Sequence, residues 1–308
     1  MNNSNKKPIL ITGSHRSGST WVGRMIALSS SVAYIHEPFN LHHRPGICKA
    51  KFDYWFPYIC GENESFYLND IENCLHFKYQ FMEELRTAKS TKDIARLLRD
   101  YIRFTKYRIL KKRPLVKDPI AVFSAEWLAR SFDMDVVVLI RHPAAFAGSL
   151  KKANWTHPFK HFLQQPLLLQ HHLSEYRSEI DEYSKTDKNI IDQAILLWNL
   201  IHHIILKYRD NSPNWIFIKH EQLSKHPVEE FSNLYKRLGL NFSTDIQQEI
   251  KKFSFADPSK EKFDPLKRNS KSNVWNWKTR LTDDEIMKIK ENTREIANYF
   301  YTEEDWIE

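Results

Sequence analysis

A serine- and glycine-rich stretch near the start of the chain has the residue types and spacing of a phosphate-binding loop. Residues 13–20 read GSHRSGST, which is close to the pattern G-x-x-x-x-G-K-[ST]. Backbone N–H groups of such a loop, together with the N-terminus of the following helix, bind phosphate oxygens without a metal. Serine occupies position 19, where nucleoside triphosphatases carry a lysine for the β- and γ-phosphates. Arg16 is the nearest cation, so we expect the loop to hold a terminal phosphate but not to hydrolyse a triphosphate.

A second motif with phosphate-binding residues follows the strongest strand signal of the sequence. Residues 136–150 read VVVLIRHPAAFAGSL. Arg141 ends the β-branched run, and Ser149 stands eight residues further along the chain. The planar guanidinium offers a fork of donors to a phosphate dianion, and the serine hydroxyl would add another donor from the next helix.

Together the two motifs resemble the nucleotide-binding loops of sulfotransferases, which use 3′-phosphoadenylyl sulfate (PAPS) as sulfuryl donor. The resemblance implies a phosphosulfate loop at residues 13–20 and a 3′-phosphate site at Arg141. The residues it assigns to the donor here are Ser14, His15, Arg16, Ser17, Gly18, Ser19, Thr20, Trp21, Arg141 and Ser149. Arginine at position 16 matches many carbohydrate and tyrosyl-protein enzymes, whereas the cytosolic small-molecule enzymes carry lysine. His142 departs from the aspartate or asparagine of many members.

A third stretch, near the C-terminus, resembles the loop with which this family covers the nucleotide. Residues 269–282 read NSKSNVWNWKTRLT and include the Trp277–Lys278 pair. The resemblance implies that Lys271 and Ser272 face the 3′-phosphate, and Ser-Lys-Ser replaces the R-K-G triplet of cytosolic members. The segment IFIKHEQL, which contains Glu221, resembles the late strand and acidic turn of the family. We expect Glu221 to be structural rather than catalytic.

Three charged residues are predicted to perform the transfer. Glu37, in the segment YIHEPFN, directly follows a predicted strand, where a parallel sheet opens its ligand crevice. The carbohydrate and tyrosyl-protein enzymes that the chain resembles use a glutamate here as general base, and His36 is the alternative base. The resemblance assigns Lys117, in LVKDPI, to the transferring group together with Arg16, and such positioned charges supply about 3 kcal/mol per donor. Asp118 is expected to orient Lys117.

The elements that position these residues alternate between strands and helices. Strands are expected at residues 8–12, 31–35, 115–116, 135–141 and 215–219. Helices are expected at residues 19–29, 91–110, 119–131, 143–152, 190–208, 228–238, 243–253 and 283–299. This alternation predicts an α/β fold with a central parallel sheet flanked by helices, and the resemblance implies the P-loop-like sulfotransferase fold. We expect one domain over residues 1–308, with residues 1–7 disordered.

Composition restricts the class of protein and of partner. The chain has 308 residues, 42% of them hydrophobic, which excludes a disordered or fibrous protein. Its 46 Lys+Arg against 38 Asp+Glu give a formal charge of +8, which favours anionic partners. Three cysteines, at positions 48, 60 and 74, are too few for a disulfide scaffold or a four-cysteine zinc site. No apolar run is long enough for a membrane span or a signal peptide, so we expect a cytoplasmic protein.

The acceptor side leaves alternatives open. Residues 103–117 contain seven Lys/Arg and no acid, and they could dock an anionic polymer or form a solvated helix face. The aromatic residues 52–58 could stack on a sugar ring or belong to the core. Three pairs of adjacent histidines do not predict a metal site, because neighbouring side chains point in different directions and no H-E-x-x-H motif occurs.

These observations predict a PAPS-dependent sulfotransferase that acts on a hydroxyl of a poly- or oligosaccharide, which could be anionic, by in-line transfer with a carboxylate as general base. Its product would be adenosine 3′,5′-bisphosphate (PAP), and neither a metal nor a nucleic acid is expected to take part. One alternative is a P-loop-type nucleotide or sugar kinase, against which the missing lysine at position 19 counts. The other is a non-catalytic protein that binds an anionic glycan or nucleic acid. The sequence does not indicate an oligomeric state.

Overall fold

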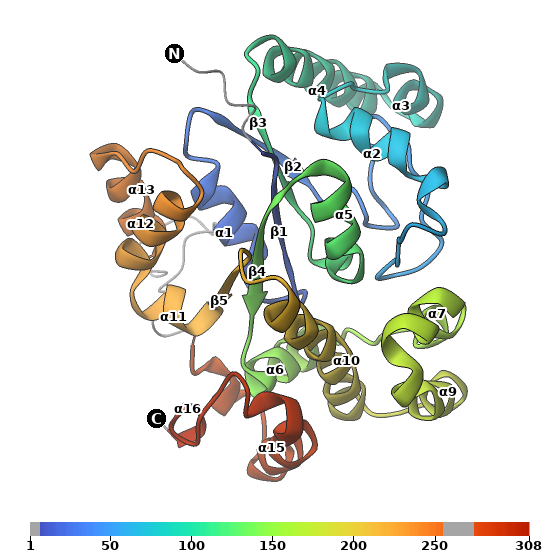
Figure 1. Ribbon diagram of the computed structural model, residues 1–308, viewed down its shortest axis with the longest axis vertical. Helices are drawn as coiled ribbons and strands as arrows, with labels where there is room; N and C mark the ends of the chain where they lie inside the picture. Colours follow the sequence, from blue (N-terminus) through green and yellow to red (C-terminus); the bar gives the residue numbers. More distant parts are fainter. Residues whose placement is uncertain (1–6, 255–273, 308) are drawn as a thin grey trace.

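A five-stranded parallel sheet forms the centre of the computed structural model (Figure 1), which describes residues 7–254 and 274–307. The strand order is β2-β3-β1-β4-β5, and each pairing is parallel. The strands are β1 Ile9–Gly13, β2 Val32–His36, β3 Arg113–Lys117, β4 Asp135–Ile140 and β5 Ile216–Lys219. All five predicted strands are therefore confirmed, with ends that differ by one or two residues. Because the strands are parallel, their carboxyl ends meet at one edge of the sheet.

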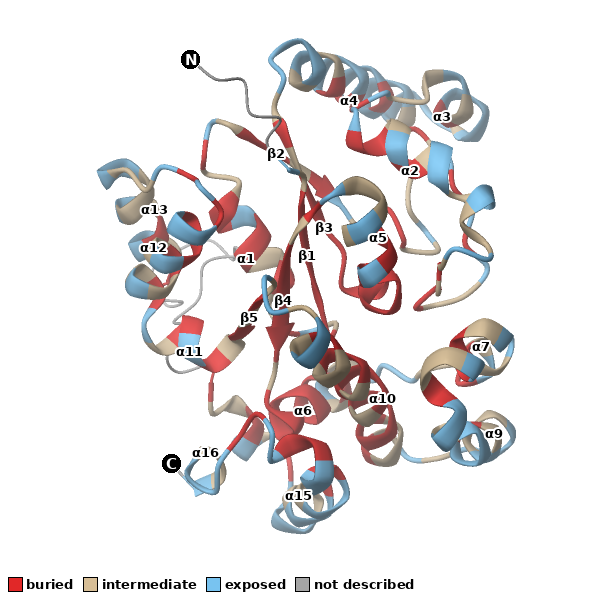
Figure 2. Cartoon of the chain, viewed as in Figure 1, coloured by how far each residue is buried: buried red, intermediate tan, exposed pale blue. Residues whose placement is uncertain are grey.

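Both faces of this sheet are covered (Figure 2). In β1, Ile9 and Ile11 belong to one buried cluster, whereas Leu10 between them belongs to the other. In β4, Val137 and Val138 divide between the same two clusters. A strand that is buried on both faces has no polar side to alternate with, which explains the unbroken β-branched run.

Helices on the two faces complete three layers. One face is covered by α1 Ser19–Ile26, α11 His220–Lys225, α12 Pro227–Arg237 and α13 Thr244–Ser254. The other is covered by η2 Pro119–Ser124, α5 Ala125–Phe132, α6 Pro143–Ala153, α10 Ile190–Asn211 and α15 Asp283–Ala297. Figure 1 shows α1, α12 and α13 on one side of the strands and α5 and α10 on the other.

The long helix α4 and several short helices lie around these layers. They are η1 Glu64–Phe66, α2 Leu68–Leu75, α3 Phe81–Thr87, α4 Thr91–Ile109, α7 Lys160–Leu163, α8 Pro166–Leu168, η3 Leu169–Leu173, η4 Ser174–Tyr176, α9 Arg177–Lys185, η5 Asn276–Thr279 and α16 Glu304–Ile307. The helix expected at residues 119–131 is divided into the 3₁₀ turn η2 and α5, and the Asp118 carboxylate caps the start of η2 through the Ile120 N–H. The helices α2, α3, α7, α8, α9, α11 and α16 were not predicted.

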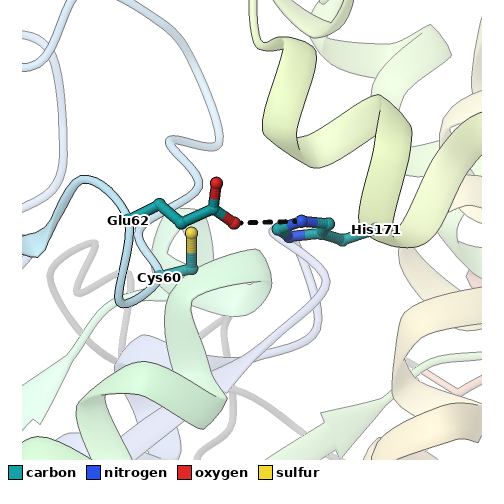
Figure 3. Close-up of side chains that lie close together, drawn as sticks. All are labelled: Cys60, Glu62 and His171. Carbon is teal, nitrogen blue, oxygen red and sulfur yellow. Dashed lines mark ion pairs between the residues drawn. The ribbon is translucent and has the colours of Figure 1, made fainter.

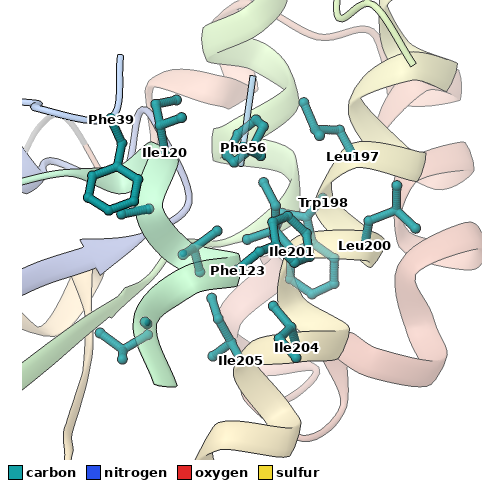
Figure 4. Packing of buried hydrophobic residues seen from close by; sticks show 14 of the residues in the cluster. Phe39, Phe56, Ile120, Phe123, Leu197, Trp198, Leu200, Ile201, Ile204 and Ile205 are labelled. Carbon is teal, nitrogen blue, oxygen red and sulfur yellow. The ribbon is translucent and has the colours of Figure 1, made fainter. Parts of the chain in front are cut away.

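The longest helix, α10, passes through the core. Figure 4 shows its Trp198 and Ile201 side chains packed close to Phe123 of η2. Among the described residues, α10 is the one helix long and apolar enough to cross a membrane, yet 61% of its most apolar stretch is buried inside the fold. A core helix meets the same test of length and composition.

Candidate active site

The carboxyl edge of the sheet brings the predicted site residues together. Residues 14–18 follow β1, Glu37 follows β2, Lys117 ends β3 and Arg141 follows β4. These four strands are neighbours in the sheet. Strands β2 and β3 also end in register, with His36 beside Lys117. Segments more than 120 positions apart in sequence, such as Arg16 and Arg141 with a separation of 125, therefore deliver their side chains to the same place, as the parallel arrangement predicts.

Glu37 and Lys117 form an ion pair at this edge. Nζ of Lys117 donates to Oε1 of Glu37, and the lysine side chain is fully buried while that of the glutamate is 21% exposed. Asn40 donates its side-chain amide to the other carboxylate oxygen, Oε2, at 3.0 Å. The carboxylate is thus held by two donors and still open to solvent. His36, the alternative base, is an exposed residue whose Nδ1 lies 3.2 Å from the Tyr34 hydroxyl.

Opposing effects set the pKa of Glu37. Burial raises it, but the charge and hydrogen bond of Lys117, followed by His36 and Asn40, lower it by more, so the pKa lies below its ordinary value. The carboxylate is therefore ionised at neutral pH and can accept a proton. Because a carboxylate is a weak base against a hydroxyl, proton transfer has to accompany the attack of the acceptor oxygen.

Asp118 fixes the backbone that carries this pair. Its buried carboxylate accepts hydrogen bonds from the backbone N–H of Phe39 at 2.6 Å and of Ile120 at 3.0 Å. Glu37 N–H donates to the carbonyl of Lys117 at 2.9 Å. Asp118 thus holds the turn after β2; its charge also interacts with that of Lys117, and its orienting role stays a prediction. Burial, and next the charge of Glu37, raises the pKa of Asp118 to about 7.

The phosphate loop contains buried polar atoms that suit an anionic ligand. The hydroxyls of Ser14 and Ser17 and Nδ1 of His15 are buried without a hydrogen-bond partner in the described part of the chain. Leaving such a group unpaired costs about 1–3 kcal/mol, a cost that a bound phosphate would remove. Burial, and then the charge of Arg16, lowers the pKa of His15 to about 3, so its imidazole is neutral at physiological pH. The loop therefore fits the phosphate end of a nucleotide donor.

The helix that follows the loop adds backbone donors. Ser19, Thr20 and Trp21 form the first turn of α1, and Gly18 precedes them with a φ of 85° and no side-chain cap. Uncapped N–H groups of a first turn bind anions. A Cβ at Gly18 would lie 2.6 Å from Nδ1 of His220, so only glycine lets the loop pass this close to α11.

Arg16 joins the two predicted phosphate motifs. Its backbone has a φ of 63°, an uncommon conformation that is often found at functional sites. Nε of Arg16 donates to the Ser149 hydroxyl at 2.9 Å. The backbone carbonyl of Arg16 accepts a hydrogen bond from Nη1 of Arg141. Nε of Arg141 is buried without a partner among the described residues. Burial lowers the pKa of Arg141 to about 10, so the guanidinium is still charged at neutral pH.

Trp155 is a residue of this site that the sequence did not indicate. It follows the end of α6 and is 51% exposed. The Arg16 guanidinium lies 5.1 Å from the centroid of its ring, and the His15 ring stacks on it at 6.4 Å. A single tryptophan after a helix carries no sequence signal for this position. Its exposed face offers a flat apolar surface beside the phosphate loop.

Glu221 and His142 connect the C-terminal segment to the end of β4. Glu221 accepts a hydrogen bond from the backbone N–H of His142 at 3.0 Å, which fits its expected structural role. The His142 ring stacks on Trp277 with centroids 5.4 Å apart, so histidine at this position contacts the segment that resembles the nucleotide-covering loop. Lys271 and Ser272, predicted to face the 3′-phosphate, lie outside the described residues.

Two acceptor-side segments are partly used by the fold itself. Within the basic stretch 103–117, Arg113 and Lys117 are buried, so its seven cations do not form one continuous surface. Within the aromatic segment, Phe52 and Phe56 are buried in the core. The core interpretation of these two rings is confirmed.

Comparisons with known proteins place the chain beside sulfotransferases. The model of a family described as "Sulfotransferase family" matches residues 8–244. The solved sulfotransferase domain from the curacin biosynthetic pathway is 17% identical, with a TM-score of 0.52 and coverage of 95% of this chain and 96% of that chain. The sulfotransferase domain of the Synechococcus PCC 7002 olefin synthase is 16% identical, with a TM-score of 0.51 and coverage of 98% of both chains. At these identities the two structures show a shared fold. No curated protein matches the sequence.

Proposed function

The chain belongs to the sulfotransferase family, and we propose that it transfers a sulfuryl group from PAPS to a hydroxyl of a carbohydrate. The observation that carries the proposal is the Glu37–Lys117 ion pair beside the phosphate loop. Strand β3 lies between β2 and β1, so Lys117 stands between the carboxylate and the loop. A base, a cation and a phosphate site therefore follow one another along the edge of the sheet.

Each charged residue has one task in the proposed reaction. PAPS supplies the sulfuryl group and leaves as PAP when the bond between sulfur and the phosphate oxygen breaks. Glu37 accepts the proton of the acceptor hydroxyl while that oxygen forms its bond to sulfur. Lys117 and Arg16 neutralise the negative charge on the sulfuryl oxygens and on the departing phosphate. The products are a sulfate ester, PAP and a protonated Glu37.

The assignment of the donor rests on the two phosphate motifs. The unpaired hydroxyls of Ser14 and Ser17 and the uncapped first turn of α1 support binding of the 5′-phosphosulfate. Arg141 and Ser149 support binding of the 3′-phosphate, since both reach Arg16 from the neighbouring strand and helix. A donor with phosphates at both ends of its ribose would bridge these groups and replace the contacts that they now make with one another.

Three features favour a carbohydrate acceptor. The base is a glutamate and the cation of the loop is Arg16, the combination of the carbohydrate and tyrosyl-protein enzymes that the sequence resembles. The exposed ring of Trp155 next to Arg16 suits the flat apolar face of a sugar. The formal charge of +8 would also attract an anionic glycan.

The variant Glu37→Gln tests the base directly. It keeps the size of the side chain and removes the proton acceptor, so the rate of sulfuryl transfer should fall by about 10²–10⁴, whereas the dissociation constant for PAP should stay within a factor of about three. Transfer is measured with labelled PAPS and a panel of mono-, oligo- and polysaccharides and a tyrosine peptide.

Glu72→Gln, the same substitution at an exposed position of α2, is the matched control and should behave as wild type. Full activity of Glu37→Gln would exclude the carboxylate as base. Transfer to the peptide with none to any saccharide would overturn the carbohydrate acceptor and leave the donor assignment intact.

A further inference from the structure

Away from the active site, three side chains with metal-binding atoms converge. They are Cys60 and Glu62, which precede α2, and His171 of η3. Their sulfur, carboxylate oxygen and ring nitrogen all lie within 4.8 Å of one another, and Figure 3 shows the three side chains directed toward a common point. Cys60 is a free thiol. Thiolate, imidazole and carboxylate are the three ligand types that zinc uses in proteins.

The spacing of two of these atoms agrees with a tetrahedral zinc site. Nε2 of His171 lies 3.3 Å from Oε1 of Glu62. Zinc–nitrogen and zinc–oxygen bonds of about 2.0–2.1 Å at a tetrahedral angle put the two ligand atoms about 3.3–3.4 Å apart. A zinc–sulfur bond of about 2.3 Å puts the sulfur about 3.6 Å from either of them. Because all three atoms lie within 4.8 Å of one another, closing the cluster requires the Cys60 sulfur to approach by at most about 1.2 Å, which is within reach of a side-chain rotation.

A hydrogen-bond network orients the imidazole for this role. The Tyr58 hydroxyl lies 3.0 Å from Nδ1 of His171 and 3.1 Å from Nε2 of His172. The hydroxyl has one proton, so it can donate to only one of the two rings. When it donates to His172, it accepts from Nδ1–H of His171, and the lone pair at Nε2 of His171 then faces Glu62 and Cys60. Metal-bound histidines commonly donate their other ring N–H in this way.

The backbone around His171 has an unusual conformation. Residues Leu169–Leu173 form a π-helix whose two end leucines are buried. π-Helices are rare in proteins, and those that occur are often found at functional sites. The rings of His171 and His172 lie at 89° to each other, but both reach the Tyr58 hydroxyl, so these adjacent histidines converge on one group, which the sequence did not predict. One histidine of the pair is enough here, because the other two ligands come from positions 60 and 62.

We propose that Cys60, Glu62 and His171 bind a zinc ion, with a water molecule as fourth ligand. The ion would fasten the loop before α2 to η3. The site shares no residue with the Glu37–Lys117 pair or the phosphate loop, so it is independent of the proposed transfer and does not take part in it. The alternative is a plain ion pair between a protonated His171 and Glu62, with Cys60 as a bystander.

Metal binding to the purified full chain tests the proposal. After chelation and dialysis, titration with zinc should give one tight equivalent per chain, and titration with cobalt should give the absorption of a thiolate–cobalt bond. Cys60→Ser and His171→Gln should weaken zinc binding by at least about 100-fold. Tyr58→Phe, which removes the orienting hydroxyl, should weaken it by about 10–100-fold.

His76→Gln, at an exposed histidine of the chain, is the matched control and should bind zinc as wild type does. Thermal midpoints measured in chelator check that the variants are folded. Absence of a stoichiometric zinc site, a cobalt complex without thiolate absorption, or wild-type binding by Cys60→Ser would each overturn the proposal. The thiolate absorption of the wild type decides the question even where a variant does not fold, and PAP binding reports separately on the active site.

Discussion

At the scale of single residues, the charge of Glu37 depends on its partner. The Lys117 ammonium and its hydrogen bond hold the pKa of Glu37 below its ordinary value against the effect of burial. A depressed carboxylate pKa stabilises the fold above the pKa of the unfolded chain, and this contribution is lost as the pH falls through the folded value. The same interaction keeps Glu37, the proposed base, ionised, so removing Lys117 should affect activity and its pH dependence together.

The variant Lys117→Met tests both effects. It should lower kcat by about 10²–10³ because a cation near the sulfuryl oxygens is lost. Burial then acts on Glu37 without the lysine, so the pKa of the carboxylate rises and the acidic limb of the kcat/KM profile moves to higher pH. The pH profile of sulfuryl transfer measures both changes. Lys106→Met, at an exposed position of α4, should leave the profile unchanged, and an unmoved acidic limb in Lys117→Met would show that Glu37 is not the titrating base.

Arg141 tests the assignment of the 3′-phosphate. Its buried Nε has no partner among the described residues, and a hydrogen bond from a charged donor contributes about 1.5–3 kcal/mol. Arg141→Ala should therefore weaken binding of PAP about 10–100-fold more than binding of 5′-AMP, which lacks the 3′-phosphate. Calorimetry with both ligands measures the difference. Arg86→Ala, at an exposed residue paired with Glu83, should change neither affinity, and equal losses for both ligands in Arg141→Ala would refute a 3′-phosphate contact.

At the scale of elements, the strands and most of the long helices could be predicted from the sequence, because their hydrophobic residues follow a regular pattern. The β-branched run of β4 reflects a strand that is buried on both faces. The apolar residues of α10 reflect a helix that is buried on most sides. Short helices such as α2 and α3 lack a long period and were missed. The partners of site residues could not be predicted, because the bond from Asn40 to Glu37 and the position of Trp155 depend on how loops fold back over the sheet edge.

Close contact between α1 and the sheet edge gives a prediction for one glycine. A Cβ at Gly23 would lie 2.8 Å from Cε2 of Tyr34 and 3.2 Å from Cγ of Lys117. Alanine favours a helix by about 1 kcal/mol over glycine, but overpacking costs about 1–3 kcal/mol. Gly23→Ala should therefore destabilise the fold by up to about 2 kcal/mol and lower kcat by displacing Lys117. Denaturant unfolding and the transfer assay measure the two effects.

Gly148 provides the matched control for this substitution. It lies in α6, where a Cβ would be 3.4 Å from its nearest neighbour, Cβ of Trp277. This contact is close to an ordinary one, so Gly148→Ala should be neutral or slightly stabilising. A Gly23→Ala variant that is as stable and as active as Gly148→Ala would show that the packing of α1 on Lys117 does not position the lysine.

At the scale of the whole molecule, ligand binding is expected to add to the stability of the chain. The phosphate loop buries hydroxyls without partners, and Arg16 and Arg141 lie together at the same edge with their positive charges close. Without a bound anion, the repulsion between the two arginines and the unpaired buried hydroxyls both lower the stability of the folded chain. A ligand with two separate phosphates would remove both costs, whereas a triphosphate would need the lysine that is absent at position 19.

Thermal unfolding with different nucleotides tests this at once and requires no acceptor. A ligand present at 100 times its dissociation constant adds about 2.7 kcal/mol of stability, which raises the midpoint of a chain of this size by a few degrees. We expect PAP to give this rise and ADP to give a smaller one, since ADP lacks the 3′-phosphate that Arg141 and Ser149 would bind. ATP with magnesium should give little. A rise with ATP and magnesium alone would instead favour phosphoryl transfer. No rise with any nucleotide would refute PAPS as the donor and favour a non-catalytic binding protein.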